Sequence, residues 1–261
     1  MGLRINQNIA AMNSYRNLSV TDGQMSKSLE KLSSGFRINR AADDAAGLSI
    51  SEGLRAQVGG LKVGSRNAQD GVSVVQTAEG ALTEVHSMLQ RMNDLSVQHN
   101  NGTNNADSKL ALTSEFDALK TEIDRIQTNT KFNGVSLLGS AAAVTFQVGY
   151  SSTDVIGFTL GAVSLGTLTI TDGGTSVQAA ITTVSTKRAD LGALQNRFEH
   201  AINSINVAVE NLSASESRIR DTDMAQEMVG YTRNQILSQA GTAMLAQANQ
   251  GSQGVLQLLR G

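Results

Sequence analysis

The sequence predicts a mainly α-helical protein, built as an elongated antiparallel helical bundle or coiled coil, with a small β-hairpin and with the N- and C-terminal helices paired. Apolar residues recur at steps of three, four or seven through most of the 261 residues, as in helices that bury one face. Proline is absent, so no proline ring interrupts long helices. Strand-like alternation is confined to one short central segment.

The N-terminal part predicts two helices separated by a charged connector. Apolar spacing indicates a first helix within residues 1–34, and Gly35 supplies its C-cap. Residues 36–44 are dense in charge and small side chains. Asp43 and Asp44 suit the start of the next helix, because a helix N-terminus favours negative charge.

A sustained helical pattern then predicts the bundle. From about 45 to 99 the apolar steps continue well past about 25 residues, which is typical of a coiled coil. The turn-rich loop 99–107 leads into a third helix at about 108–129, and a fourth helical pattern runs over 177–212. These three helices are expected to form an elongated bundle.

The centre of the chain predicts a small β element. Residues 144–150 alternate in the manner of a strand, and 155–160 can return as its partner after a turn. Residues 168–174, LTITDGG, resemble one more short strand and a turn. The β-hairpin element therefore occupies about 135–174.

The C-terminal part mirrors the N-terminal one. Ser213 and Glu216 have capping-box spacing, which indicates a helix restart. The charged segment 215–224 precedes a last helix at 223–259. We therefore expect three regions: residues 1–40 paired with 222–261, and a bundle over 41–221. Because a lone pair of such polar helices is marginal in water, the termini are expected to fold only in a partner's presence.

The last helix contains a run of 26 residues, 234–259, without a charge. Its apolar residues are interrupted by many amides and hydroxyls, which are costly in hydrocarbon, so we expect a protein-packed helix and no membrane contact. The N-terminus lacks the apolar core of a signal peptide. The protein is therefore expected to be cytoplasmic or exported by a route that does not read such a signal.

Composition argues against most other functions. A net charge of −2 and 3% aromatic residues predict no nucleic-acid partner. Cysteine is absent, which excludes disulfides and thiolate ligands. The three histidines, His86, His99 and His200, form no HExxH pair, and the paired carboxylates lack a neighbouring catalytic group. We therefore expect no enzyme activity, no cofactor and no metal.

Several long motifs resemble bacterial flagellin. They are INQNIAAMNSYRNL, LEKLSSGFRINRAADDAAGLSISEGLRAQ and FNGVSLL in the first part, and SRIRDTDMAQEM and MLAQANQ near the end. The resemblance covers about 1–139 and 176–261. Only about 40 residues separate these parts, so the large variable outer domains of longer flagellins are expected to be missing.

The resemblance implies a filament subunit for motility, exported unfolded by the flagellar type III apparatus to the extracellular filament. The implied partners are further copies of the chain, an export chaperone, and the cap and hook-junction proteins. A hook–filament junction protein is the alternative within the same superfamily. An exported coiled-coil adhesin or effector is a more distant one, which would fold stably as a monomer.

The resemblance also implies sites. In the family, positions matching Arg91, Leu95, Gln98 and Glu115 contact neighbouring subunits and the vertebrate Toll-like receptor that senses flagellin. The alternative is an ordinary solvated helix face. Terminal helices of the family line an inner tube, for which this chain offers an apolar stripe: Ile5, Ile9, Met12, Ile236, Met244, Leu245, Leu256 and Leu259.

Two further groups of side chains are candidate sites. The connector residues Arg37, Arg40, Asp43 and Asp44 would form ion pairs between subunits or a solvated spoke. Some flagellins are O-glycosylated on outer loops, where this chain has hydroxyl side chains that otherwise serve as turn residues. Those hydroxyl residues are Ser151, Ser152, Thr153, Thr175 and Ser176.

Overall fold

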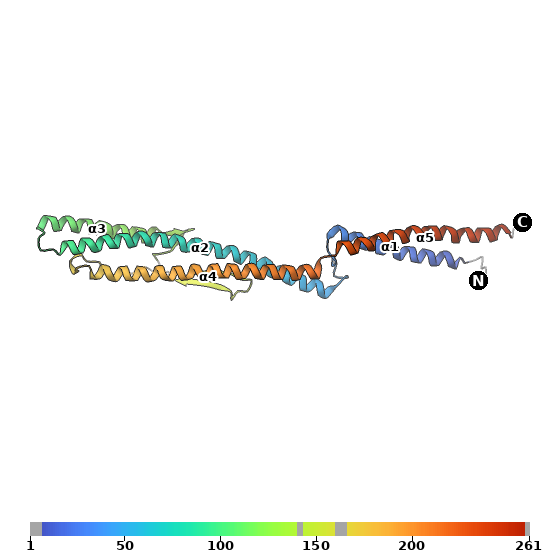
Figure 1. The fold of residues 1–261 in the computed structure, drawn as a ribbon, viewed down its shortest axis with the longest axis horizontal. Helices are drawn as coiled ribbons and strands as arrows, with labels where there is room; N and C mark the ends of the chain where they lie inside the picture. The colour runs from blue at the N-terminus through green and yellow to red at the C-terminus, as the bar shows by residue number, and fades with distance from the viewer. Residues whose placement is uncertain (1–6, 140–142, 160–165, 259–261) are drawn as a thin grey trace. The chain divides into compact units, whose positions relative to one another are not determined.

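The computed structural model describes residues 7–139, 143–159 and 166–258, and there it has the predicted mainly helical architecture (Figure 1). The helices are α1 (Ile9–Ser34), α2 (Ala45–His99), α3 (Ala106–Asn129), α4 (Thr175–Arg220) and α5 (Met224–Leu258). The strands are β1 (Lys131–Phe132), β2 (Val135–Ser136), β3 (Ala143–Gln147) and β4 (Val155–Thr159). One short 3-10 helix, η1, spans Ile170–Asp172.

The chain divides into two compact units. The terminal unit comprises Met1–Ala56 and Leu212–Gly261, and the bundle unit comprises Gln57–Asn211. The predicted terminal regions were 1–40 and 222–261. The terminal unit is larger, because the first turns of α2 and the last turns of α4 belong to it.

The bundle unit is organised around an apolar core from α2, α3 and α4. Residues Leu82, Val85, Leu89 and Met92 of α2 follow steps of three and four, and all are fully buried. Phe116 and Ile123 of α3 and buried residues of α4 such as Val184, Leu191 and Phe198 complete the core. The heptad pattern therefore correctly predicted the buried face of each bundle helix.

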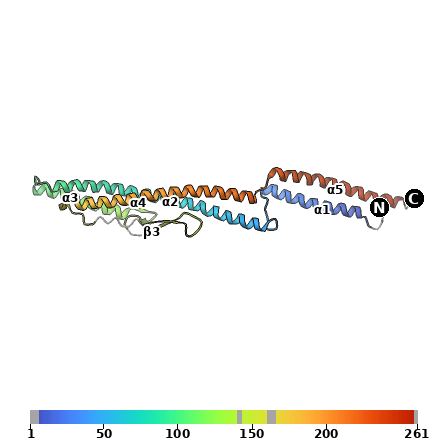
Figure 2. The ribbon, with the colours of Figure 1, turned by 60° about the horizontal axis from the view of Figure 1, so that its bottom comes forward.

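The predicted hairpin is formed by β3 and β4 and packs on this core. The strands pair antiparallel, with Val144 opposite Phe158 and Phe146 opposite Ile156. The Phe146 ring meets the ring of Phe198 on α4 edge to face, with centroids 5.4 Å apart. Figure 2 shows β3 alongside α2 and α4. The hairpin is thus a covering element of the helical bundle.

Glycines of α2 make room for this hairpin. A Cβ atom on Gly64 would lie 2.5 Å from the Val148 carbonyl oxygen, and one on Gly60 would lie 2.9 Å from the Tyr150 Cβ. Gly59, by contrast, has no such neighbour within 4 Å. The glycine-rich stretch at the start of the long helix therefore serves close packing within the chain at Gly60 and Gly64.

Two predictions about local structure are wrong. Residues 168–174 form no third strand: η1 lies there, and the Ile170 carbonyl accepts a hydrogen bond from the buried Ser96 hydroxyl at 2.8 Å. No helix restarts at Ser213, because α4 continues to Arg220 without an intervening helix-breaking residue. The charged connector before α5 is consequently only residues 221–223.

A second hairpin, formed by β1 and β2, was not predicted from the sequence. Phe132 pairs with Val135 across a two-residue turn. Both turn residues adopt positive φ, 46° at Asn133 and 81° at Gly134, as a type I′ turn requires. The signal was present as the Asn-Gly dipeptide between Phe132 and Val135.

The terminal unit contains the pair of α1 and α5, which lie side by side in both views (Figures 1 and 2). Asn8 caps α1 by accepting a hydrogen bond from the Ala11 amide at 3.0 Å, and Gly35 ends the helix in the left-handed conformation, as predicted. Helix α5 continues through Gly251 and Gly254 to Leu258.

Candidate interaction surfaces

The connector between α1 and α2 is joined to the start of the α4–α5 junction by backbone pairing. The Arg37 amide donates to the Arg220 carbonyl at 2.7 Å, and the Thr222 amide donates to the Gly35 carbonyl at 3.0 Å. Phe36 and Asp221 thereby form an isolated antiparallel bridge. Segments from opposite ends of the chain are thus held together at this point.

Side chains reinforce this junction. The Arg220 guanidinium lies 4.8 Å above the Phe36 ring centre and pairs with Glu52 at 2.6 Å. Arg37 donates to the Ile219 carbonyl at 2.6 Å. The role of Arg220 was missed from sequence, because nothing in its spacing points to a partner more than a hundred residues away.

The predicted connector residues are all engaged within the chain. Arg40 pairs with Glu30 at 2.8 Å. Asp44 accepts a hydrogen bond from the Gly47 amide at 2.8 Å and so caps α2. Backbone amides of Arg40 and then Asn39 hold the pKa of Asp43 below its ordinary value, since they stabilise its carboxylate. Ion pairs between subunits remain a prediction for these residues.

Most described residues of the predicted apolar stripe remain exposed in the helix pair. Ile9, Met12, Ile236 and Met244 are each more than half exposed, and only Leu245 is partly buried. Smaller residues occupy much of the contact between α1 and α5, and the assignment of the stripe to an inner tube stays a prediction. Ile5 and Leu259 lie outside the described residues, as does the side chain of Leu256.

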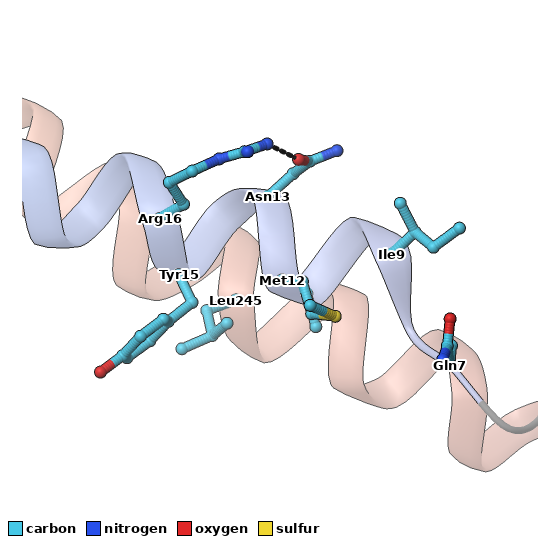
Figure 3. A pocket seen from close by; sticks show the side chains of 8 residues that line it. Gln7, Ile9, Met12, Asn13, Tyr15, Arg16 and Leu245 are labelled. Carbon is cyan, nitrogen blue, oxygen red and sulfur yellow. Dashed lines mark hydrogen bonds between the residues drawn. The ribbon is translucent and has the colours of Figure 1, made fainter.

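The outward apolar side chains form two open grooves. Figure 3 shows the first, which Ile9, Met12 and Tyr15 of α1 and Leu245 of α5 line. The second lies along α5, between Met228, Val229, Ile236 and Leu237 and the neighbouring Thr232 and Arg233. Such a concentration of exposed large apolar residues on one helix pair indicates an interaction surface.

Of the four residues predicted to form the receptor and subunit face, three are exposed and one is buried. Arg91 of α2 and Glu115 of α3 are exposed and form an ion pair at 2.8 Å, and Gln98 is exposed as well. Leu95 is fully buried and belongs to the bundle core. Its assignment to the surface is wrong, because it continues the buried steps of α2 that include Met92.

The candidate hydroxyl residues differ in their surroundings. Ser152 and Thr153 are exposed in the β3–β4 turn, where the Ser151 and Thr153 hydroxyls lie 3.0 Å apart. Thr175 is exposed as the first residue of α4. Ser176 is partly buried, and its hydroxyl accepts a hydrogen bond from the Thr169 amide at 3.3 Å.

Neither a metal centre nor a membrane helix is evident in the part of the chain that the structure describes. No three His, Asp or Glu side chains there gather closely enough to hold a metal ion. None of the helices there combines the length and apolar content that crossing a bilayer requires.

Comparison with known proteins decides the family. The model of the bacterial flagellin N-terminal helical region matches residues 5–143, and that of the C-terminal helical region matches 175–259. The chain belongs to the bacterial flagellin family. These two matched regions contain the helices of both units, and the segment between them contains β4 and η1.

Individual flagellins match along almost their whole length. The flagellin of Halalkalibacterium halodurans is 52% identical, covering 98% of this chain and 99% of that protein. The flagellin of Bacillus subtilis is 45% identical, over 99% of this chain and all of that protein. A flagellar filament 33 kDa core protein of Treponema phagedenis is 43% identical, over 98% of this chain and 99% of that protein. Two of these relatives are flagellins and the third is a flagellar filament core protein, and the junction-protein alternative is not better supported.

Proposed function

We propose that this flagellin is the structural subunit of a flagellar filament and that the exposed apolar faces of α1 and α5 form contacts between copies. The observation that carries the proposal is the arrangement of the helix pair. Large apolar side chains such as Met12, Ile236 and Met244 remain more than half exposed although α1 and α5 are paired. Removing apolar surface from water contributes about 25 cal/mol per Å², so covering these faces with further copies favours assembly.

The proposal includes a route to the outside of the cell. The filament is extracellular, and the chain reaches it unfolded through the flagellar type III apparatus, with an export chaperone, cap and hook-junction proteins as partners. The absence of proline and cysteine suits a chain that folds on arrival, since neither prolyl isomerisation nor disulfide formation delays it.

Seeded polymerisation tests the assembly role. Full-length protein mixed with short filament fragments is expected to give long filaments by negative-stain electron microscopy, and a chain lacking residues 224–261 is expected to give none. Ile236→Ser with Met244→Ser should raise the critical concentration for growth. Tyr150→Ser, which removes an exposed aromatic ring from the bundle unit, is the control and should leave it unchanged. Filaments from the truncated chain would contradict the proposal, and short capped stubs from the full chain would favour the junction alternative.

A second proposed role is recognition by the Toll-like receptor that senses flagellin. The exposed Arg91–Glu115 pair, with Gln98 on the same end of α2, supplies charged and amide groups to a partner. Arg91→Ala is expected to weaken receptor binding in a surface-plasmon-resonance assay. Arg125→Ala removes an exposed arginine paired with Glu122 and serves as control. Equal binding by both variants would exclude this face.

A further inference from the structure

The contact between α1 and α5 is made chiefly of small and polar side chains. The buried or partly buried positions of each helix recur at steps of three and four, as in a coiled coil. On α1 they include Ala11, Ser14, Leu18, Thr21, Met25 and Ser28. On α5 they include Glu227, Asn234, Ser238, Gly241, Leu245 and Ala248.

Polar contacts along this seam define one antiparallel register. The Asn8 side chain donates to the Ala248 carbonyl at 2.9 Å at one end. The Ser238 hydroxyl donates to the Asp22 carboxylate at 2.9 Å near the middle. Lys31 and Glu227 lie 4.0 Å apart toward the other end.

The apolar seam residues alone do not select this register. Leu18 packs against Gly241, where a Cβ atom would lie 3.3 Å from the Leu18 Cδ1. A slip of about seven residues, one heptad, brings Leu18 level with Ala248 and Met25 level with Gly241. A large side chain would again meet a small one, so packing tolerates the slip.

Polar residues distinguish the two registers. The same slip takes Asp22 away from Ser238 and brings it level with Leu245. The leucine side chain offers no hydrogen-bond donor to the carboxylate. The slip also separates Lys31 from Glu227. The slipped alignment therefore loses the exposed Ser238–Asp22 hydrogen bond and the Lys31–Glu227 pair. Polar contacts of this kind specify register in coiled coils.

We infer that Asp22, through Ser238, is the positioning residue that fixes the register of α1 against α5, with Asn8 and Lys31 supporting it. The inference rests on the proposed assembly role, because the register decides which apolar side chains share each outward face. A slipped pair would still be helical, but it would present a different pattern to neighbouring copies.

Disulfide trapping reads the register directly, because the native chain has no cysteine. For Leu18→Cys with Gly241→Cys, the Cβ atoms would lie 3.7 Å apart, within the range that a disulfide needs. Leu18→Cys with Ala248→Cys reports the slipped register, since these positions are offset by roughly 10 Å in the native pair. Each full-length double variant is oxidised with and without filament seeds, and intrachain disulfides are identified by mass spectrometry of peptides.

In the presence of filament seeds, the native background is expected to form the 18–241 disulfide and not the 18–248 disulfide. Adding Asp22→Ala is expected to produce the 18–248 disulfide, whereas Gln24→Ala, at an exposed position of the same helix, should not. An Asp22→Ala chain that forms only the 18–241 disulfide would overturn the inference, as would a native chain that forms neither. A native chain that forms the 18–241 disulfide but no filaments would contradict the assembly proposal and leave the register inference standing.

Discussion

At the scale of single residues, Gly64 and Asp172 show how local chemistry supports the bundle unit. Gly64 permits the backbone of the β3–β4 turn to lie against α2. Asp172 accepts hydrogen bonds from the Ser176 and Gly174 amides at 2.9 Å and 3.1 Å, and so satisfies the exposed amides at the start of α4. Each residue therefore acts on backbone atoms of another segment.

Gly64→Ala is expected to lower the free energy of unfolding by about 1–3 kcal/mol, because the new methyl group overlaps the Val148 carbonyl. Gly59→Ala is the matched control, since that position has open space, and it should stabilise the helix by about 0.5–1 kcal/mol. Urea unfolding followed by circular dichroism measures both. Equal effects of the two substitutions would contradict the close packing of the hairpin on α2.

Asp172 predicts a stability that depends on pH. The Ser176 hydroxyl, followed by the amides of Ser176 and Gly174, lowers the pKa of Asp172 below its ordinary value of 3.8. A carboxylate with a lowered folded pKa contributes stability above its unfolded pKa and loses it as the pH falls through the folded pKa. We therefore expect Asp172→Asn to flatten the loss of stability below pH 3.8 in acid titrations monitored by circular dichroism. Asp117→Asn, which removes an exposed carboxylate from α3, should leave that loss unchanged.

At the scale of elements, Phe198 joins three parts of the bundle. Its ring meets Phe146 of β3, and it fills the space that Gly71 leaves on α2, where a Cβ atom would lie 2.6 Å from the ring. Helix α4 therefore contacts both the long helix and the hairpin through one buried side chain. This explains why a hairpin too small to be stable alone is ordered here.

Phe198→Ala is expected to destabilise the bundle unit by about 3–5 kcal/mol, because it removes a fully buried ring and leaves a cavity. Phe198→Leu keeps part of the volume and should cost less. Thermal unfolding of the full chain compares the two. Similar losses for both variants would contradict this expectation and would show that the ring contact with Phe146, which both variants remove, outweighs the volume that leucine retains.

At the scale of the whole molecule, the two units differ in how much they bury. The bundle unit contains nearly all of the fully buried apolar residues, whereas Ser28 is the only buried residue on α1 among those described. Since burial supplies most of the stability of a helix in water, the pair of α1 and α5 gains little from contacts within one chain. Burying the exposed apolar faces of α1 and α5 would therefore stabilise the pair more than the contacts within one chain do.

Amide hydrogen exchange is therefore expected to distinguish the units. In the unassembled chain, amides of α1 and α5 should exchange rapidly, while those of α2 from about residue 57 onward stay protected. Seeded filaments should protect both sets. Protection of α1 and α5 in the unassembled chain would contradict the expectation that these helices fold only with a partner.

The sequence by itself determined the helices, the position of the main hairpin and the buried face of the bundle. Steps of three and four reach from Leu82 to Met92 within a single helix, so the core positions are encoded locally. The motifs near both ends also identified the family. These features depend on neighbours in sequence, which is why spacing alone was sufficient.

Only the tertiary structure decided which side chains meet across long distances in the chain. It placed Leu95 in the core, turned Ile236 and Met244 outward, and paired Arg220 with Phe36 and Glu52. Periodicity gives a helix an apolar face but does not say which neighbour covers it. For α5 the small and polar seam residues faced α1, because close approach of two helices favours small side chains, and the large apolar residues were left exposed.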